Sequence, residues 1–179
     1  MPIENYEDVS NYALDPDQQE ELLRSQKEAS FIWGTKDHWP VGVIMSYVWR
    51  DGSFWLTATT QRKRIAALRR DNRVTVIVSG MGTPVGPSTS ATAKGRCFFH
   101  DDEDTKAWFY PALSEAVLGG TGPLTDMFTQ MLDSERRVIL EVVPEKWITF
   151  DASKMMADSL EAWTTAAQGG SGPSGVDLP

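Results

Sequence analysis

Residues 56–74 have the sequence LTATTQRKRIAALRRDNRV, and this stretch predicts a strand, a helix and a second strand in close succession. Ile65 and Leu68 are three positions apart, the spacing of neighbours on the buried side of a helix, which we place at residues 61–71. The β-branched residues that follow predict a strand over residues 73–79. A strand that enters a short helix directly is therefore the starting point for the fold.

The start of this helix combines threonine hydroxyls with basic side chains. Thr59 or Thr60 is placed to cap the helix, and the unpaired backbone amides of a helix start attract an anion. Arg62 adds a bidentate donor and Lys63 adds a point charge. Together with Thr57, which shares a strand face with Thr59, these groups predict a phosphate-binding site. A solvated basic face of the helix is the alternative that composition alone leaves open.

Positive charge is concentrated in this segment. Six of the 17 lysines and arginines lie between positions 62 and 73, against the single acid Asp71, whereas the whole chain has 25 aspartates and glutamates and a net charge of −8. An acidic chain is a poor binder of duplex nucleic acid, which is recognised through many phosphates. Binding of single-stranded RNA is also disfavoured, because residues 62–73 include no aromatic side chain for stacking. A small ligand with one phosphate fits this distribution better.

Strand patterns surround this stretch. A helix is predicted from Pro16 to Lys27, with proline and acids in its first turn, and the Asp51-Gly52 pair predicts a hairpin. Along Val41–Trp49 both strand faces are largely apolar, as in a sheet covered on both sides. The remaining expected elements are strands at 30–33, 53–59, 91–100, 137–143 and 147–150, helices at 101–117 and 125–132, and a long loop at 80–90.

Six or seven short strands with a few helices between them predict a mainly β, α+β fold built on a small antiparallel barrel. We expect the barrel domain to span residues 15–152. An acidic N-terminal segment, 1–14, precedes it. The C-terminal segment, 153–179, is expected to begin as a weak helix and to end in a flexible Gly/Ser/Pro tail from residue 169.

The composition fits one cytoplasmic domain. A length of 179 residues is ordinary for a single compact domain. The single cysteine, Cys97, allows no internal disulfide and is expected to be buried and inert; with two histidines it is too little for a zinc site, so no metal is expected. His100-Asp101-Asp102 predicts a helix cap rather than a metal site. No leader and no apolar run of membrane-spanning length is present, so we expect neither secretion nor membrane insertion.

From about residue 15 to 150 the sequence resembles a known superfamily, the pyridoxamine 5'-phosphate oxidase-like split β-barrel proteins. Members of that superfamily include FMN-dependent and coenzyme F-420-dependent oxidoreductases. The resemblance rests on four motifs: Trp39-Pro40-Val41 through Val48-Trp49, Leu56-Thr57, Arg62-Lys63, and Leu68-Arg69-Arg70-Asp71-Asn72-Arg73-Val74, in which Asn72 stands where proline is usual.

This resemblance implies a six- to seven-stranded FMN-binding type of split barrel that forms a homodimer and holds FMN or coenzyme F-420 in a groove between two subunits. In relatives the position matching Thr57 touches the flavin, and the positions matching Arg62 and Lys63 bind its phosphate. Trp49 and Trp55 flank the hairpin that leads to Thr57 and are expected to line the ring pocket. Further candidates for cofactor binding are the neighbouring residues Thr59, Thr60, Gln61 and Ser79.

The sequence also departs from one branch of the superfamily. The pyridoxamine phosphate oxidases themselves have an arginine and a lysine on the strand that matches residues 40–49, and a basic, tryptophan-containing motif at the C-terminus. In this chain the strand has only apolar or small residues, and the chain ends in Gly, Ser and Pro. We therefore expect a different activity from vitamin B6 oxidation, and the junction at residues 68–71 resembles the branch that uses coenzyme F-420.

The predicted function is an oxidoreductase that transfers hydride to or from a small organic substrate. Because the cofactor carries the hydride chemistry, no catalytic residue has to be identifiable in the sequence. The alternative is a protein with the same barrel that carries a flavin, a haem or another tetrapyrrole without turnover. For haem iron, His38 and His100 are the only imidazole candidates.

Overall fold

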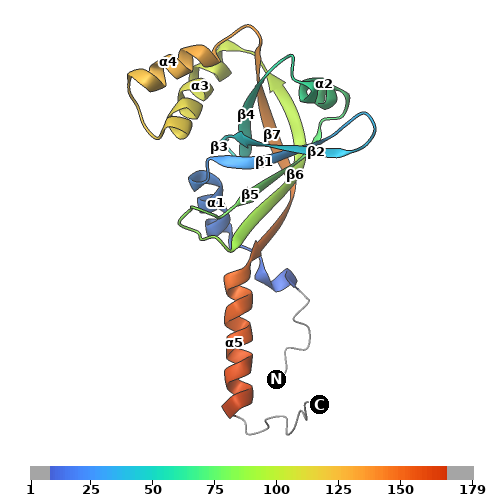
Figure 1. Ribbon diagram of the computed structural model, residues 1–179, viewed down its shortest axis with the longest axis vertical. Coiled ribbons are helices and arrows are strands. Elements are labelled where there is room, and N and C mark those ends of the chain that lie inside the picture. The colour runs from blue at the N-terminus through green and yellow to red at the C-terminus, as the bar shows by residue number, and fades with distance from the viewer. Residues whose placement is uncertain (1–8, 169–179) are drawn as a thin grey trace, which may run out of the picture.

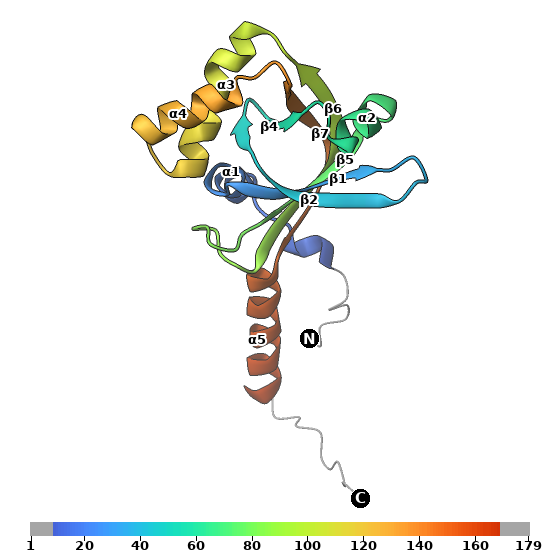
Figure 2. The same cartoon turned by 45° about the horizontal axis from the view of Figure 1, so that its top comes forward.

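The computed structural model describes residues 9–168 and contains one seven-stranded antiparallel sheet that curls into a split barrel (Figure 1). The strands follow the order β2-β1-β5-β6-β7-β4-β3 around the barrel, into which Figure 2 looks. The elements in chain order are η1 (Val9–Tyr12), α1 (Pro16–Ser25), β1 (Glu28–Gly34), β2 (Pro40–Ser46), β3 (Val48–Arg50), β4 (Ser53–Thr59), α2 (Lys63–Arg70), β5 (Arg73–Ser79), β6 (Thr89–His100), α3 (Glu103–Leu118), α4 (Pro123–Leu132), β7 (Arg137–Asp151) and α5 (Ala152–Gln168). The predicted α+β split barrel is thus confirmed.

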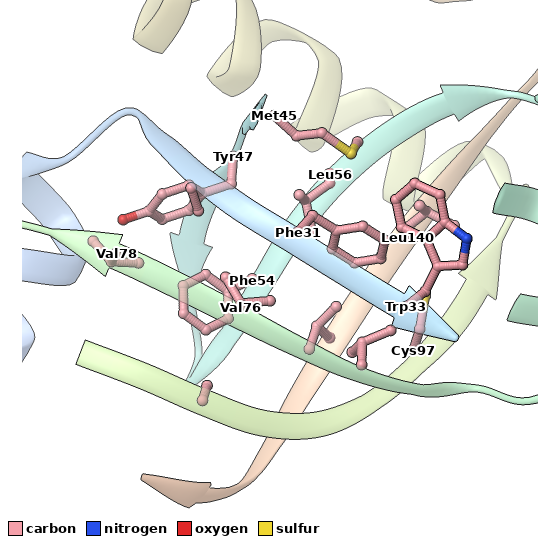
Figure 3. Packing of buried hydrophobic residues seen from close by; sticks show 14 of the residues in the cluster. Phe31, Trp33, Met45, Tyr47, Phe54, Leu56, Val76, Val78, Cys97 and Leu140 are labelled. Atoms are coloured by element: carbon pink, nitrogen blue, oxygen red, sulfur yellow. The ribbon is translucent and has the colours of Figure 1, made fainter. Parts of the chain in front are cut away.

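The barrel interior is filled by alternate residues of the strands, because successive side chains of a strand point to opposite faces (Figure 3). On β4 the buried set is Phe54, Leu56 and Ala58. Tyr47 lies in the short break between β2 and β3, is 2% exposed, and donates its hydroxyl to the carbonyl oxygen of Leu23 on α1 at 2.9 Å. Cys97 is buried as predicted, and burial raises the pKa of its thiol to about 12.

A second, smaller cluster lies on the outside of the sheet beneath α3 and α4. Phe109 and Leu113 of α3 pack with Leu132 of α4 against Ile139 of β7. The helix α3 begins as the sequence predicts, since the side chain of Asp102 accepts a hydrogen bond from the Thr105 amide at 2.8 Å. These two helices therefore cover part of the outer face of β7 and β4.

The last two predicted strands are one strand, β7, because a bulge in β7 itself, at the unpaired Glu145, accommodates the interrupting proline. The β6–β7 register shifts between Lys94 and Gly95, and Gly95 then pairs with Pro144. A Cβ atom at Gly95 would collide with the carbonyl oxygen of Val143, so the close approach of the two backbones requires glycine. From the sequence alone Pro144 predicts the end of a strand, but the strand continues past it because Pro144 lies beside a bulge.

The predicted threonine cap of α2 is wrong. Arg62 occupies the N-cap position without a side-chain cap bond, because a turn over residues 59–62 separates the strand from the helix. In that turn the Thr60 amide donates to the carbonyl of Arg136, and the Arg62 amide donates to the carbonyl of Thr59. The threonine hydroxyls are therefore not used by the helix.

The strand β2 is covered on one face only within a single chain. Met45 is 8% exposed and faces the core, whereas the neighbouring Ile44, on the opposite face, is 63% exposed. The expected cover on both faces is thus absent from the chain itself in residues 9–168. This edge strand has a free apolar face.

Beyond the barrel, the predicted C-terminal helix is present as α5, which extends away from the sheet (Figure 1). Most of the acidic N-terminal segment, residues 1–8, and the whole Gly/Ser/Pro tail, residues 169–179, lie outside the described residues. Among the helices between residues 9 and 168, none combines the length and the apolar character that crossing a membrane requires.

Candidate functional site

The strand β4 carries the predicted site on the face opposite the barrel core. Trp55, Thr57 and Thr59 are partly buried on this outer face, while the residues between them point inward. Thr57 pairs with Ile139 of β7 and donates its hydroxyl to the carbonyl oxygen of Val138 at 3.0 Å. The outer face of β4 therefore leads from the aromatic cluster below α3 to the start of α2.

The start of α2 holds basic side chains that have no acidic partner. Thr60, Gln61, Arg62 and Lys63 are all exposed, and the first turn of α2 contains no acid. Asp71, the only acid of the segment, is bound to Arg73 through a hydrogen-bonded ion pair of 2.6 Å. Among residues 9–168, no acidic side chain forms an ion pair with Arg62 or Lys63. The positive charge is thus available to a ligand.

Buried polar atoms without partners mark the same region. In the part of the chain that the structure describes, four such side-chain atoms occur: the hydroxyl oxygens of Thr59 and Tyr110, and the Nε atoms of Arg64 and Arg137. Native proteins leave few buried donors unpaired, because an unpaired group costs about 1–3 kcal/mol. Burial and then the charge of Arg62 lower the pKa of Arg64, so a nearby anion would relieve both effects. These atoms indicate a binding site for a hydrogen-bond acceptor.

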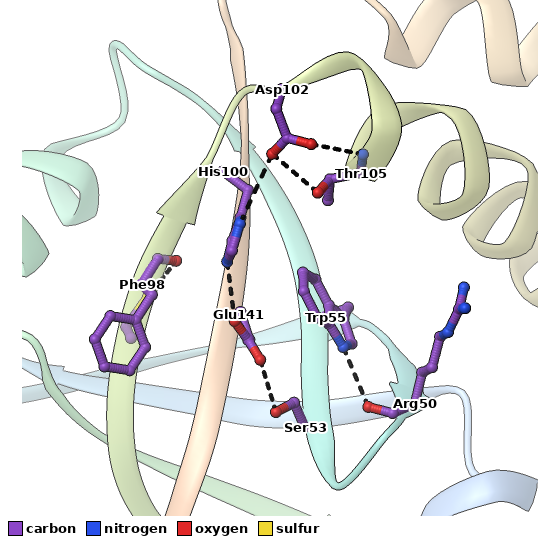
Figure 4. A network of polar contacts seen from close by, with 9 residues as sticks. Arg50, Ser53, Trp55, Phe98, His100, Asp102, Thr105 and Glu141 are labelled. Carbon is purple, nitrogen blue, oxygen red and sulfur yellow. Dashed lines mark hydrogen bonds and ion pairs between the residues drawn. The ribbon is translucent and has the colours of Figure 1, made fainter.

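The aromatic part of the outer face is continuous with a polar network (Figure 4). The Trp55 ring lies 5.0 Å from that of Trp108 and 5.1 Å from that of His100, measured between centroids. Nε2 of His100 lies 2.9 Å from a carboxylate oxygen of Glu141, and the other carboxylate oxygen accepts a hydrogen bond from the Ser53 hydroxyl at 2.9 Å. This network fixes the side chains that flank Trp55.

Two predicted residues lie apart from this group. Trp49 pairs with Phe54, so it shares the core face of the sheet, and its ring nitrogen donates to Glu20 at 2.9 Å. It is therefore on the other face from Thr57, whereas Trp55, the second tryptophan predicted for the ring pocket, shares the face of Thr57. Ser79 ends β5 and pairs with Ser90 at the start of β6, at the end of the sheet opposite Thr59.

An open hollow of about 640 Å³ adjoins the C-terminal half of α2. Its lining includes Arg69, Arg70, Phe98 and Phe99, and the Arg69 guanidinium lies 4.7 Å from the centre of the Phe99 ring. This hollow places further positive charge next to aromatic surface. It is large enough for an extension of a ligand bound at the other end of the helix.

Arg137 and Tyr110 were missed by the sequence analysis. They belong to β7 and α3, which are far along the chain from residue 59, and no local motif distinguishes them. The pairing of β4 with β7 sets Arg137 opposite Thr59. The only sequence signal for Arg137 is the pair Arg136-Arg137 at the start of a predicted strand. That this pair lies beside β4 follows from the sheet topology and cannot be predicted from neighbouring residues.

Comparisons with solved structures agree with the observed fold. No family model matches the sequence, and no curated protein matches it. Among solved structures, a conserved hypothetical protein from Mycobacterium tuberculosis is 18% identical, with a TM-score of 0.68 over 79% of this chain and 88% of that one. An F-420 reductase is 21% identical, with a TM-score of 0.55 over 72% of this chain and 94% of that one. A protein of the pyridoxinephosphate oxidase family, related to general stress protein 26, from Clostridium acetobutylicum is 17% identical, with a TM-score of 0.54 over 78% of this chain and 95% of that one. The chain therefore has the split β-barrel fold of the pyridoxamine 5'-phosphate oxidase-like and F-420 reductase proteins.

Proposed function

We propose that the protein is an oxidoreductase that binds coenzyme F-420 or FMN and transfers hydride to or from a small organic substrate. The observation that carries the proposal is the group of unpaired donors at the junction of β4 and α2. Arg62 and Lys63 have no acidic partner in residues 9–168, and the Thr59 hydroxyl and Arg64 Nε are buried without a hydrogen bond. A phosphate accepts hydrogen bonds from all of these groups.

The residues of the chain position the cofactor in two parts. Arg62 and Lys63 bind the phosphate, and the Thr59 hydroxyl and the free amides at the start of α2 complete its coordination. The ring then lies along the outer face of β4, where Thr57 and Trp55 are exposed in part. The bound cofactor supplies the hydride chemistry. The protein's task is to fix the ring and to exclude water from one side of it.

The length of the cofactor's anionic tail distinguishes coenzyme F-420 from FMN. Coenzyme F-420 has a longer anionic tail than FMN, and the hollow beside α2 offers Arg69 and Arg70 to the additional charges. This favours coenzyme F-420. Absorption and fluorescence spectra of the protein, as purified and after incubation with each cofactor, distinguish FMN from a deazaflavin directly.

The double substitution Arg62→Ala with Lys63→Ala tests the site. Each charge-assisted contact contributes about 1.5–3 kcal/mol, so the double variant is expected to bind its cofactor at least about a hundredfold more weakly. Arg24→Ala with Lys27→Ala removes the same charge from exposed positions at the end of α1 and beyond it, and serves as the control. Equal affinity in both double variants would overturn the site assignment. Turnover with reduced cofactor and a panel of enones and quinones then separates an enzyme from a carrier.

We also propose that two copies form a homodimer. Apolar side chains remain exposed on the outside of the barrel, including Ile44 of β2, Phe98 of β6 and Ile148 of β7. A second copy that covers them would close a groove over the outer face of β4. In this arrangement the phosphate stays bound to α2 while the partner covers the ring.

A further inference from the structure

Two buried donors lie where β4, β7 and α3 meet, and the phosphate site at α2 does not use them. The Tyr110 side chain is 2% exposed and its hydroxyl has no hydrogen-bond partner in residues 9–168. Nε of Arg137 is buried and also unpartnered. Burial raises the pKa of Tyr110, whereas the charge of Arg137 and, more weakly, the Thr57 hydroxyl lower it. Thr57 donates its own hydroxyl to the Val138 carbonyl, and its contact with Tyr110 lacks the geometry of a hydrogen bond. Both groups therefore lie at the same place, beside Thr57.

Sheet register connects these two donors to the phosphate site. Arg137 pairs with Thr59 across the β4–β7 ladder, and opposite residues of an antiparallel pair have Cβ atoms about 4.5–5.5 Å apart. The adjacent peptide reinforces the contact, since the Thr60 amide donates to the Arg136 carbonyl at 2.7 Å. An oxyanion held at Thr59 thus lies within reach of Arg137 on one side and of the start of α2 on the other.

The chemistry of these two side chains selects an acceptor. An arginine Nε is always a donor, and a tyrosine whose pKa is raised remains protonated at neutral pH and can donate. In the described part of the chain no carboxylate forms an ion pair with Arg137. Two donors without an acceptor are satisfied by an oxyanion, such as a phosphate group.

We propose that Arg137 and Tyr110 form the second wall of the cofactor's phosphate site, opposite Arg62 and Lys63. The assignment rests on the proposed function, because it takes the phosphate of FMN or coenzyme F-420 as the ligand. It adds two residues from distant parts of the chain to the site. It also explains why both donors are left unpaired in the protein alone.

The test compares ligands that differ in the phosphate. FMN is paired with riboflavin, and coenzyme F-420 is paired with its deazaflavin analogue that lacks the phosphate; binding is measured by fluorescence titration. Arg137→Gln is expected to weaken binding of the phosphate-bearing ligand about ten- to a hundredfold and to change binding of its phosphate-free analogue less than about threefold. Arg136→Gln is the control, since it removes the same charge from the adjacent exposed side chain and should leave both affinities unchanged.

Tyr110→Phe separates a ligand-binding role from a structural one. Removing an unpaired buried hydroxyl should leave the melting temperature of the ligand-free protein unchanged or raise it, while binding of FMN or coenzyme F-420 weakens about tenfold. A lower melting temperature with unchanged affinity would show that Tyr110 serves the fold alone. Arg137→Lys keeps the positive charge at this position. If it retains more affinity for the phosphate-bearing ligand than Arg137→Gln does, the loss of affinity in Arg137→Gln comes from the missing charge and not from misfolding.

The outcomes distinguish this assignment from the function on which it rests. If the wild type prefers the phosphate-bearing ligand but Arg137→Gln retains that preference, the second wall is overturned and the site at α2 stands. The same holds if Arg137→Gln and Arg136→Gln lose affinity equally, because the effect would then be general electrostatics. A wild type that binds both ligands of each pair equally overturns the phosphate site itself and this assignment with it.

Discussion

At the scale of single residues, Thr57 and Thr59 show how a strand can divide structural and functional work. They lie on the same face of β4, two positions apart, and both are partly buried. The Thr57 hydroxyl donates to the Val138 carbonyl at 3.0 Å, whereas the Thr59 hydroxyl is buried and unpaired. The bonded hydroxyl of Thr57 therefore stabilises the ligand-free protein, whereas the unpaired hydroxyl of Thr59 destabilises it.

Valine substitutions at these two threonines should have opposite effects on the free energy of unfolding. Thr57→Val loses a hydrogen bond and is expected to destabilise the ligand-free protein by about 1 kcal/mol. Thr59→Val removes an unpaired buried hydroxyl from a strand and is expected to be neutral or to stabilise by up to about 1 kcal/mol, while it weakens cofactor binding. Urea denaturation without ligand measures both values. Equal destabilisation by the two variants would mean that Thr59 has a partner in the protein alone.

At the scale of elements, the longest pairing in the sheet, β6 with β7, depends on one bulge. The register shift at Lys94 and Gly95 lets both strands continue past Pro144, which brings the start of β7 to Thr59 and its end to α5. A bulge also increases local twist, which a curled sheet requires. The position of Arg137 is therefore connected to a glycine far along the same ladder.

Replacing Gly95 tests this dependence. Gly95→Ala places a Cβ against the Val143 carbonyl, so we expect a loss of about 1–3 kcal/mol in the free energy of unfolding. Gly34→Ala is the matched control, because a Cβ there meets nothing within 4 Å and alanine is usually favoured over glycine in a strand by about 0.5–1 kcal/mol. Thermal and urea denaturation compare the two variants. A Gly95→Ala protein as stable as the control would show that the bulge relaxes without cost.

The sequence predicted those elements whose signals are local. The helix start at Pro16, the Asp51-Gly52 hairpin, the Asp102 cap and the strand from Arg73 to Ser79 all follow from neighbouring residues, and the structure has each of them. Predictions failed where the deciding partner is distant in the chain. The bulge of β7 opposite Gly95 lets the strand continue past Pro144, and β3–β4 pairing places Trp49 on the core face.

The candidate site divides in the same way. The cluster of Arg62 and Lys63 beside Thr59 is continuous in the sequence, so charge and spacing were enough to find it. Arg137 and Tyr110, which we propose for the same site, come near Thr57 and Thr59 only through sheet register and helix packing. Side chains brought together by topology have no signature in a single sequence.

At the scale of the whole molecule, one apolar face of the barrel is not covered by any other part of the described chain, residues 9–168. The sequence of β2 is apolar on both sides, yet one chain buries only the side that carries Met45. Trp39 and Ile44 are more than 60% exposed, and such side chains gather near the edge of the sheet rather than singly over the surface. A second copy would bury the apolar area and would also shield the edge strand from other chains.

Ile44→Asp should therefore convert a dimer into a folded monomer. In a two-fold interface each residue occurs twice, and each unpaired charge buried at the contact costs about 3–5 kcal/mol, or a factor of about 10² to 10⁴ in the dimer dissociation constant. Because Ile44 is 63% exposed within one chain, the substitution should leave the circular dichroism spectrum and the fold of the monomer unchanged. Light scattering after size exclusion should give twice 19.9 kDa for the wild type and for the control Ile44→Val, and 19.9 kDa for Ile44→Asp. An Ile44→Asp protein that remains dimeric would place the contact elsewhere on the surface. A wild type that is monomeric at high concentration would exclude the dimer, and one chain would then have to complete the groove over β4 by itself.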